Sequence, residues 1–376
     1  MREVMTYKSG KFYFTDVYDQ NRIANLLLHA NILQNTILSL PLLPDWSSQI
    51  NPEIMYNSIA GTAAIEGNAI NEQDVRKIAE GKAPEAQYSQ KHQTEIKNLI
   101  NAYTLIDNIS VAQQPFKLSE ELVCELHRVI TIDIPDENNI PGAYRNGKVY
   151  VGDTAHGGIY TPPKILEDIT RLMQEFIEWI NCEDITNKPP FIRATLAHYH
   201  FALIHPFWDG NGRVARLIEA LLLQSAGIKY APKSLSNYYY KHVDDYYIAF
   251  SKSIKEKKEI TSFLEFTLKG VINILLQMKE VIIFFIKKLA LRDYLHVLLN
   301  NEKRISKRQH DLISLLLDKS NDTVSLNELS AKRPYSLLYR RVSSQTARRD
   351  LKKLLEIKLL RIDESGRYLI NLDALG

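Results

Sequence analysis

A run of twelve residues beginning at His205 combines a possible base, a carboxylate, a glycine-flanked turn and two arginines. It reads His-Pro-Phe-Trp-Asp-Gly-Asn-Gly-Arg-Val-Ala-Arg. A Gly-Asn-Gly turn directly before an amphipathic helix leaves unpaired backbone N–H groups at the helix N-terminus, and small residues let an anion approach them closely. Gly210, Asn211 and Gly212 therefore predict a phosphate-binding site.

Four side chains around this turn could act on a bound phosphate. Arg213 and Arg216 stand three residues apart on the expected helix, so both can reach phosphate oxygens from one side. Asp209 can hold a divalent cation that bridges those oxygens. His205, whose ordinary pKa lies near neutrality, can take a proton from a hydroxyl nucleophile. Each residue alone has a plainer explanation as a turn, a cap or a core side chain, but their combination in one block favours a functional site.

His198 and His200, just before this block, suggest a metal site at first sight. On a helix, positions two apart point roughly 200° away from each other. We therefore expect both histidines to pack or to form hydrogen bonds rather than to share a metal ion.

The block also matches, at every fixed position, the signature HPFx[DE]GNGRxxR of the Fic domain family. The resemblance continues at Pro141–Arg145, Val151–Gly152, Tyr160–Pro163 and Tyr246–Tyr247, and it covers residues 20–270. It implies a mainly α-helical Fic core with a β-hairpin flap. It also implies a protein adenylyltransferase that moves AMP from ATP to a Ser, Thr or Tyr hydroxyl of a target protein or of itself.

The resemblance assigns a role to each residue of the block. His205 would be the general base, Asp209 would bind Mg²⁺ (or Mn²⁺), and Arg216 would meet the γ-phosphate. Gly210, Gly212, Arg213 and both the backbone and side chain of Asn211 would surround the other phosphates.

Two further segments of the resemblance lie outside the block. Val151, Gly152, Asp153 and Thr154 would form the flap, which registers a target segment by strand addition. Tyr246 and Tyr247 would line the nucleotide site, although a place in the core explains them equally well.

An upstream segment, Thr62-Ala-Ala-Ile-Glu66-Gly67, resembles the [ST]xxxE[GN] inhibitory motif that Fic proteins carry on a separate helix. The resemblance implies that Thr62, Glu66 and Gly67 belong to an autoinhibitory element. Its physical basis is competition, because a carboxylate and a γ-phosphate would bind the same Arg216 guanidinium.

Most of the chain has the apolar period of helices. Helices are predicted at 17–38, 51–65, 93–108, 119–131, 165–180, 191–204, 243–254 and in the segment that follows Gly212. Alternating residues on either side of a polar turn predict a β-hairpin at 148–161. These elements would place the candidate base and the phosphate turn between two consecutive helices.

The C-terminal part has a charge balance of its own. Residues 301–376 hold 16 lysines and arginines against 10 aspartates and glutamates, within a chain of net charge +3. A helix at 309–317, a short helix after Ser325, a basic helix capped by Ser343 and a hairpin at 361–370 follow winged-helix order. Such a domain could bind DNA or a protein, and we expect it to be dispensable for the chemistry.

The sequence thus predicts four parts: an N-terminal helical segment (1–50), a Fic domain (51–270) that includes an inhibitory helix (52–67), a connecting helix (271–300) and a winged helix (301–376). Two cysteines and no apolar run of 18 residues favour a cytoplasmic protein without a membrane span. Removal of AMP, transfer of another nucleotide and a homodimer remain open, as does a DNA-binding regulator in which the Fic site is secondary.

Overall fold

The computed structural model describes residues 1–109, 115–256, 259–318 and 323–374. They form two compact units, 1–278 and 279–376. The prediction of a mainly α-helical chain is confirmed. The division falls at 278/279 instead of at 270 and 300, because the expected connecting segment is part of one helix, α12 (Thr261–His296), that contributes to both units.

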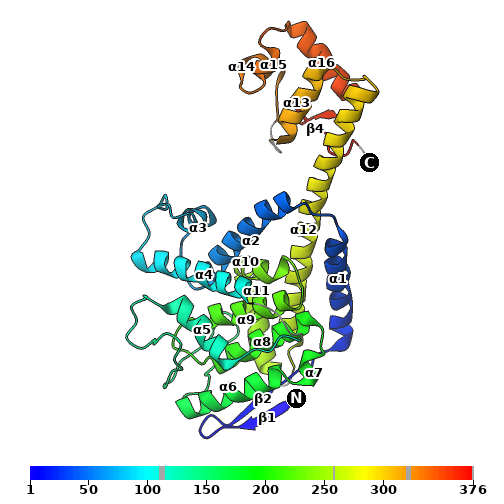
Figure 1. Cartoon of the computed structure of the whole chain (residues 1–376). Helices are drawn as coiled ribbons and strands as arrows, with labels where there is room; N and C mark the ends of the chain where they lie inside the picture. The colour runs from blue at the N-terminus through cyan, green and yellow to red at the C-terminus, as the bar shows by residue number, and fades with distance from the viewer. Residues whose placement is uncertain (110–114, 257–258, 319–322, 375–376) are drawn as a thin grey trace. The chain divides into compact units, whose positions relative to one another are not determined.

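Two helices at the centre of the first unit position the candidate site (Figure 1). They are α8 (Pro190–Ile204) and α9 (Asn211–Ser225), which pack closely on each other. Every residue of α8 from Phe191 to Ile204 is buried. The short segment between the two helices is therefore held at both ends by buried helices.

The remaining helices of the first unit enclose this pair. They are α1 (Gln20–Ser39), α2 (Pro44–Ile65), α3 (Glu72–Ala79), α4 (Gln90–Asn108), α5 (Glu120–Thr131), α6 (Leu166–Ile180), α7 (Glu183–Thr186), α10 (Ala231–Lys241) and α11 (Val243–Glu256). All the helices predicted for this unit are present within a few residues of their expected ends. Helices α3, α7 and α10 were not predicted.

Helix α2, which ends at the expected inhibitory residues, packs along α10. The contact needs a glycine, since a Cβ on Gly61 would lie 2.6 Å from the Cα of Asn237. The chain leaves the helix through Gly67, whose φ of +84° is a left-handed conformation that glycine adopts easily. The end of α2 is thus fixed by close backbone packing and a glycine stop.

The N-terminal segment was expected to be helical, but its first residues form an antiparallel hairpin. Strand β1 (Arg2–Met5) pairs with β2 (Lys11–Phe14). The buried Asp168 carboxylate of α6 accepts hydrogen bonds from the N–H groups of residues 7, 8 and 9 in the turn. Phe14 is fully buried and its ring lies 5.4 Å from that of Trp179. Four-residue strands held by such distant partners leave little local signal.

The hairpin expected at 148–161 is reduced to one antiparallel bridge. Val151 and Tyr160 exchange two backbone hydrogen bonds of 2.9 and 2.8 Å. Gly152, Gly157 and Gly158 all have positive φ, so the extended backbone is interrupted directly beyond the bridge. We call residues 148–161 the flap.

The second unit has the element order that the sequence predicts for a winged helix. It contains a π-turn (Val297–Asn301), α13 (Lys307–Asp318), α14 (Leu326–Ala331), α15 (Ser336–Tyr339), α16 (Ser344–Glu356), β3 (Leu360–Ile362) and β4 (Tyr368–Ile370). Ser343 caps α16 as expected, and Val324 adds a bridge to Tyr368 beside the β3–β4 hairpin. Leu312, Leu351 and Leu354 belong to a separate buried core.

Candidate active site

A cavity of about 330 Å³ lies where the flap, the ends of α2 and α8, the start of α9 and helix α11 meet. The residues that line it are Glu66, Tyr150, Val151, Gly152, Asp153, Ala202, His205, Gly212, Arg216, Tyr246, Tyr247 and Phe250. Nine of these twelve were candidate site residues in the sequence. Five separate segments therefore bring the predicted base, arginine, inhibitory carboxylate, flap and tyrosines to one cavity.

The turn between α8 and α9 is shaped by Asn211. Its side-chain amide donates to the carbonyl of Phe207 over 2.8 Å, and its Oδ1 accepts from the Phe207 N–H over 2.9 Å. The expectation that this side chain surrounds a phosphate is wrong, because both polar atoms are used and the residue is buried. Gly210, with a φ of +79°, lies at the N-cap of α9, so the first N–H groups of the helix have no partner within it.

His205 ends α8 in a left-handed conformation, with a φ of +51°. Burial lowers the pKa of its imidazole to about 4, so the ring is neutral at physiological pH. Its Nδ1 lies 3.3 Å from the Ala202 carbonyl oxygen, which can only accept a hydrogen bond. The proton of the neutral ring is therefore on Nδ1, and Nε2 keeps the lone pair that a base requires.

Arg145 positions the backbone of this histidine. It is fully buried, and its Nε donates to the His205 carbonyl over 2.7 Å, while its backbone N–H donates to the Pro206 carbonyl over 2.9 Å. A third bond joins the guanidinium to the Gly147 carbonyl, just before the flap. The family resemblance included Arg145, and the structure supplies its role: it fixes the base relative to the flap.

Arg216 is held by two residues of the expected inhibitory motif. The Arg216 side chain is buried, and its Nη2 donates to Glu66 Oε1 over 2.7 Å. Its Nε donates to Thr62 Oγ1 over 2.7 Å, and Nη2 also reaches the Thr62 carbonyl at 3.3 Å. One face of the guanidinium is thus occupied by α2. Gly67 has no such contact and serves only as the helix stop.

Gly212 lets these groups approach the first turn of α9. A Cβ at this position would lie 2.5 Å from Glu66 Oε1 and 3.1 Å from Arg216 Nη1. The Glu66 carboxylate therefore occupies space directly over the helix N-terminus, where the helix dipole and free N–H groups favour an anion.

Asp209 and Arg213 form a pair at the rim of the same turn. Arg213 Nη2 donates to Asp209 Oδ2 over 2.6 Å, and Asp209 Oδ1 accepts from the Gly210 N–H over 2.6 Å. The positive charge of Arg213 and these bonds keep the pKa of Asp209 below its ordinary value against the effect of burial. The carboxylate is ionised and its side chain is 44% exposed. No group of three metal-ligating side chains occurs among the described residues.

Within the flap, Asp153 lines the cavity but Thr154 does not. His156 accounts for the position of the turn, since its Nδ1 lies 2.9 Å from Asp153 Oδ1 and its Nε2 lies 3.0 Å from Asp244 Oδ1 on α11. Both carboxylates raise the pKa of the imidazole. The flap is therefore tied to α11 by side chains and not by strand pairing.

Tyr246 lines the cavity and also belongs to the core, so the two interpretations of this residue are both correct. It is 6% exposed, and its hydroxyl lies 3.0 Å from Nε2 of His198. The Nδ1 of that histidine lies 2.9 Å from the buried Glu219 carboxylate, which also accepts from Tyr239. His200 contacts the Thr15 carbonyl over 2.8 Å. Both histidines form hydrogen bonds, as expected.

Three lining residues escaped the sequence analysis. Tyr150, Ala202 and Phe250 look like ordinary strand and helix residues, and they reach the cavity only through the fold. Ala202 is one turn before His205, which is a spacing that could have suggested it.

Comparison with known proteins agrees with this geometry. Residues 117–223 match the model of the Fic/DOC family. Protein adenylyltransferase Fic of Drosophila erecta is 35% identical over 191 residues, which are 50% of this chain and 36% of the relative. The protein of the same name in Drosophila ananassae is 34% identical over the same extent. The aligned region is thus only about a third of the length of these curated relatives.

Solved structures share the fold over a longer part of the chain. A Fic family protein from Desulfovibrio desulfuricans covers 96% of this chain and 98% of its own, with a TM-score of 0.60 and 20% identity. Fic-1 from C. elegans covers 69% of this chain and 72% of its own, with a TM-score of 0.56 and 21% identity. The turn, the buried arginine and the histidine described above all lie within the matched residues 117–223, which constitute a domain of the Fic/DOC family.

Proposed function

We propose that this protein is an adenylyltransferase that moves AMP from ATP to a hydroxyl group of a protein. The observation that carries the proposal is the pairing, across one cavity, of a neutral His205 with the Arg216 guanidinium at a helix N-terminus. Relatives named protein adenylyltransferase Fic support the choice of reaction.

The reaction follows from the positions of these groups. ATP places its phosphates over the N-terminus of α9, where the backbone N–H groups and Arg216 bind them. The target hydroxyl gives its proton to His205 Nε2, and its oxygen attacks the α-phosphorus. The bond from that phosphorus to the bridging oxygen breaks, and pyrophosphate leaves. The products are an AMP ester on the target and a protonated histidine, which returns its proton to solvent.

Labelled ATP tests the proposal directly. The full chain, incubated with a bacterial or eukaryotic lysate, should transfer label from α-labelled ATP to protein and none from γ-labelled ATP. Transfer of the γ-label would indicate a kinase. Label from another nucleoside triphosphate, or release of AMP from a modified protein, would keep the site and change the reaction.

A divalent cation fits the site as a companion of the substrate. Asp209 is one ionised, partly exposed carboxylate beside the phosphate turn, and Mg²⁺ is commonly bound by one or two carboxylates together with substrate phosphates. When bound, the cation would neutralise charge on the phosphates. We expect excess EDTA to abolish transfer and Asp209→Ala to raise the Mg²⁺ concentration that gives half the maximal rate. Full activity in EDTA would exclude this role, and Asp153→Ala provides a control carboxylate in the same cavity.

The second unit supports DNA binding as an additional function. Arg348, Arg349, Lys352 and Lys353 are exposed on α16, the helix before the hairpin. If they contact phosphates, affinity for duplex DNA should fall steeply with salt, because each neutralised phosphate releases counterions. Changing Arg348 and Arg349 to Gln should reduce the slope of affinity against salt, whereas changing the exposed Lys287 should not. The absence of any gel shift at ~50 mM salt would favour a protein partner for this unit.

A further inference from the structure

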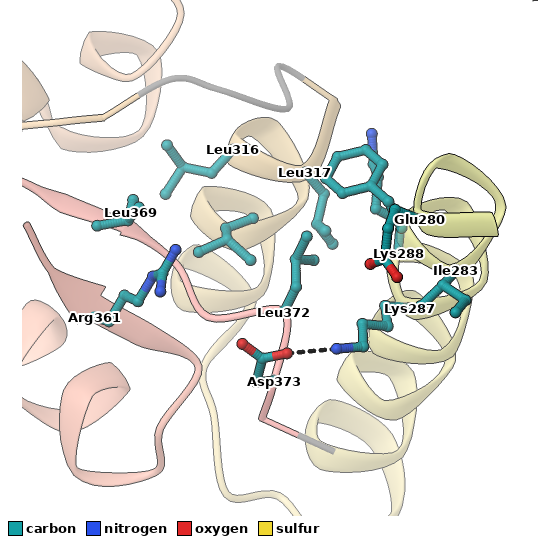
Figure 2. A pocket seen from close by; sticks show the side chains of 12 residues that line it. Glu280, Ile283, Lys287, Lys288, Leu316, Leu317, Arg361, Leu369, Leu372 and Asp373 are labelled. Carbon is teal, nitrogen blue, oxygen red and sulfur yellow. Dashed lines mark hydrogen bonds and ion pairs between the residues drawn. The ribbon is translucent and has the colours of Figure 1, made fainter. Parts of the chain in front are cut away.

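A second and larger cavity lies in the unit formed by residues 279–376. It has a volume of about 440 Å³, compared with about 330 Å³ for the cavity beside His205. Figure 2 shows it between the 280–288 stretch of α12, the end of α13 and the β3–β4 hairpin with the residues that follow it. Nothing in the proposed reaction uses this cavity.

The wall of this cavity is mainly apolar. Leu316 and Leu317 are buried at the end of α13, with exposed fractions of 2% and 1%. The other apolar side chains that line it are Ile283, Phe284, Leu369, Ile370 and Leu372. These are mostly aliphatic, so the cavity suits a hydrocarbon body better than a flat heterocycle.

Charged residues lie around this apolar wall, and they are not equivalent. Lys287 is committed to an ion pair with Asp373, drawn as a dashed line in Figure 2. The ammonium of Lys288 lies 5.6 Å from the centre of the Phe284 ring. Arg361, on β3, makes no hydrogen bond or ion pair within the part of the chain that the structure describes, although its charge helps to lower the pKa of Asp373. Arg361 is therefore the cation that remains available to a ligand.

We propose that this cavity binds a small amphipathic monocarboxylate, with its carboxylate on Arg361 and its hydrocarbon body against Leu316, Leu317 and Leu372. An arginine presents a planar pair of N–H donors that matches a carboxylate. Each buried methylene group adds about 0.8 kcal/mol of hydrophobic stabilisation. A polyphosphate is disfavoured, because Glu280 and Asp373 also line the cavity and leave one uncommitted arginine.

Such a ligand would join the helix to the hairpin. Ile283 belongs to α12, while Arg361 and Leu369 belong to the hairpin strands, so one bound molecule contacts both. Because it binds only the folded unit, it raises the thermal midpoint of that unit with concentration.

Octanoate and 1-octanol provide a matched pair of probes for the full chain. Isothermal titration should give one saturable octanoate site, with affinity about 10–100-fold above that for the alcohol, the ratio expected from one charge-assisted hydrogen bond. Arg361→Gln should remove that advantage. Arg341→Gln, an exposed arginine of the same unit that does not line the cavity, should leave it unchanged.

A second variant tests the location without removing the charge. Ile283 is only partly buried on α12, so Ile283→Trp should fill the cavity and weaken octanoate binding at least tenfold without unfolding the unit. The proposal is overturned if octanoate shows no saturable binding at roughly 10 mM, or if the alcohol binds equally well. Tighter binding of pyrophosphate than of octanoate, or an unchanged affinity in both variants, would overturn it as well.

Discussion

Replacing His205 by alanine is expected to slow AMP transfer by about 10²–10⁴-fold, the usual contribution of a general base. Affinity for ATP should change little, because the phosphates are bound by the N-terminus of α9 and by Arg216. The measurement is the initial rate of label transfer from α-labelled ATP, together with ATP binding followed by titration. His200→Ala is a poor control because that histidine is buried; the exposed His29 provides a better one. A His205→Ala protein that labels its target at the normal rate would refute the mechanism.

The same histidine determines the pH dependence. Its pKa in the folded protein is lowered to about 4, whereas the unfolded value is near 6.5. The base is therefore already deprotonated at neutral pH, and the rate should stay flat as pH falls from about 8 to about 6. The unfolded chain binds this proton more readily, so the stabilising contribution present above pH ~6.5 is lost as pH falls towards ~4. A rate profile with a midpoint near 6.5 would show a solvated histidine instead.

Replacing Glu66 by glycine is expected to raise the rate of AMP transfer, by up to about 10²-fold. Glu66 Oε1 accepts from Arg216 Nη2, the donor that a γ-phosphate would need. ATP bound beside this carboxylate is displaced, and a misplacement of about an ångström can cost about 10²-fold in rate. ATP affinity should rise about 10–100-fold, the value of one charge-assisted bond. ADP affinity should rise far less, since ADP has no γ-phosphate.

Three companions make this comparison decisive. Combining Glu66→Gly with His205→Ala should return the rate to the background. Arg216→Ala should not activate, because it removes the ATP ligand together with the anchor of the inhibitor. Thr62→Ala removes only the bond to Arg216 Nε, so it should activate less than Glu66→Gly. If Glu66→Gly is no faster than the parent protein, the end of α2 is structural and autoinhibition is wrong.

Much of the site could be predicted because it is local in sequence. Residues 205–216 carry a base, a turn and a helix start in one block, and each of these depends on neighbouring residues. The helix positions followed from apolar periodicity for the same reason. Glu66 was found only through resemblance to a known motif. Its contact with Arg216 joins residues 150 positions apart, and no periodicity reports such a contact.

What could not be predicted depends on which partner wins a polar atom. Asn211 looks like a phosphate ligand in the sequence, but both ends of its amide bind Phe207. The N-terminal hairpin depends on Asp168, more than 150 residues away, and the flap is held by His156 instead of by strand pairing. Helix α10 was missed although α2 packs against it so tightly that Gly61 is required. These outcomes are decided by tertiary contacts, which sequence patterns do not record.

The tight approach of Glu66 to Gly212 has a consequence for genetics. Any side chain at position 212 would collide with the carboxylate and with Arg216, and it would also fill the space over the helix N-terminus that a triphosphate needs. A substitution there removes the inhibitor and the substrate together. In a random screen for hyperactive alleles, we therefore expect the gain-of-function hits to map to the last turn of α2. Substitutions in the first turn of α9 should appear only among the null alleles.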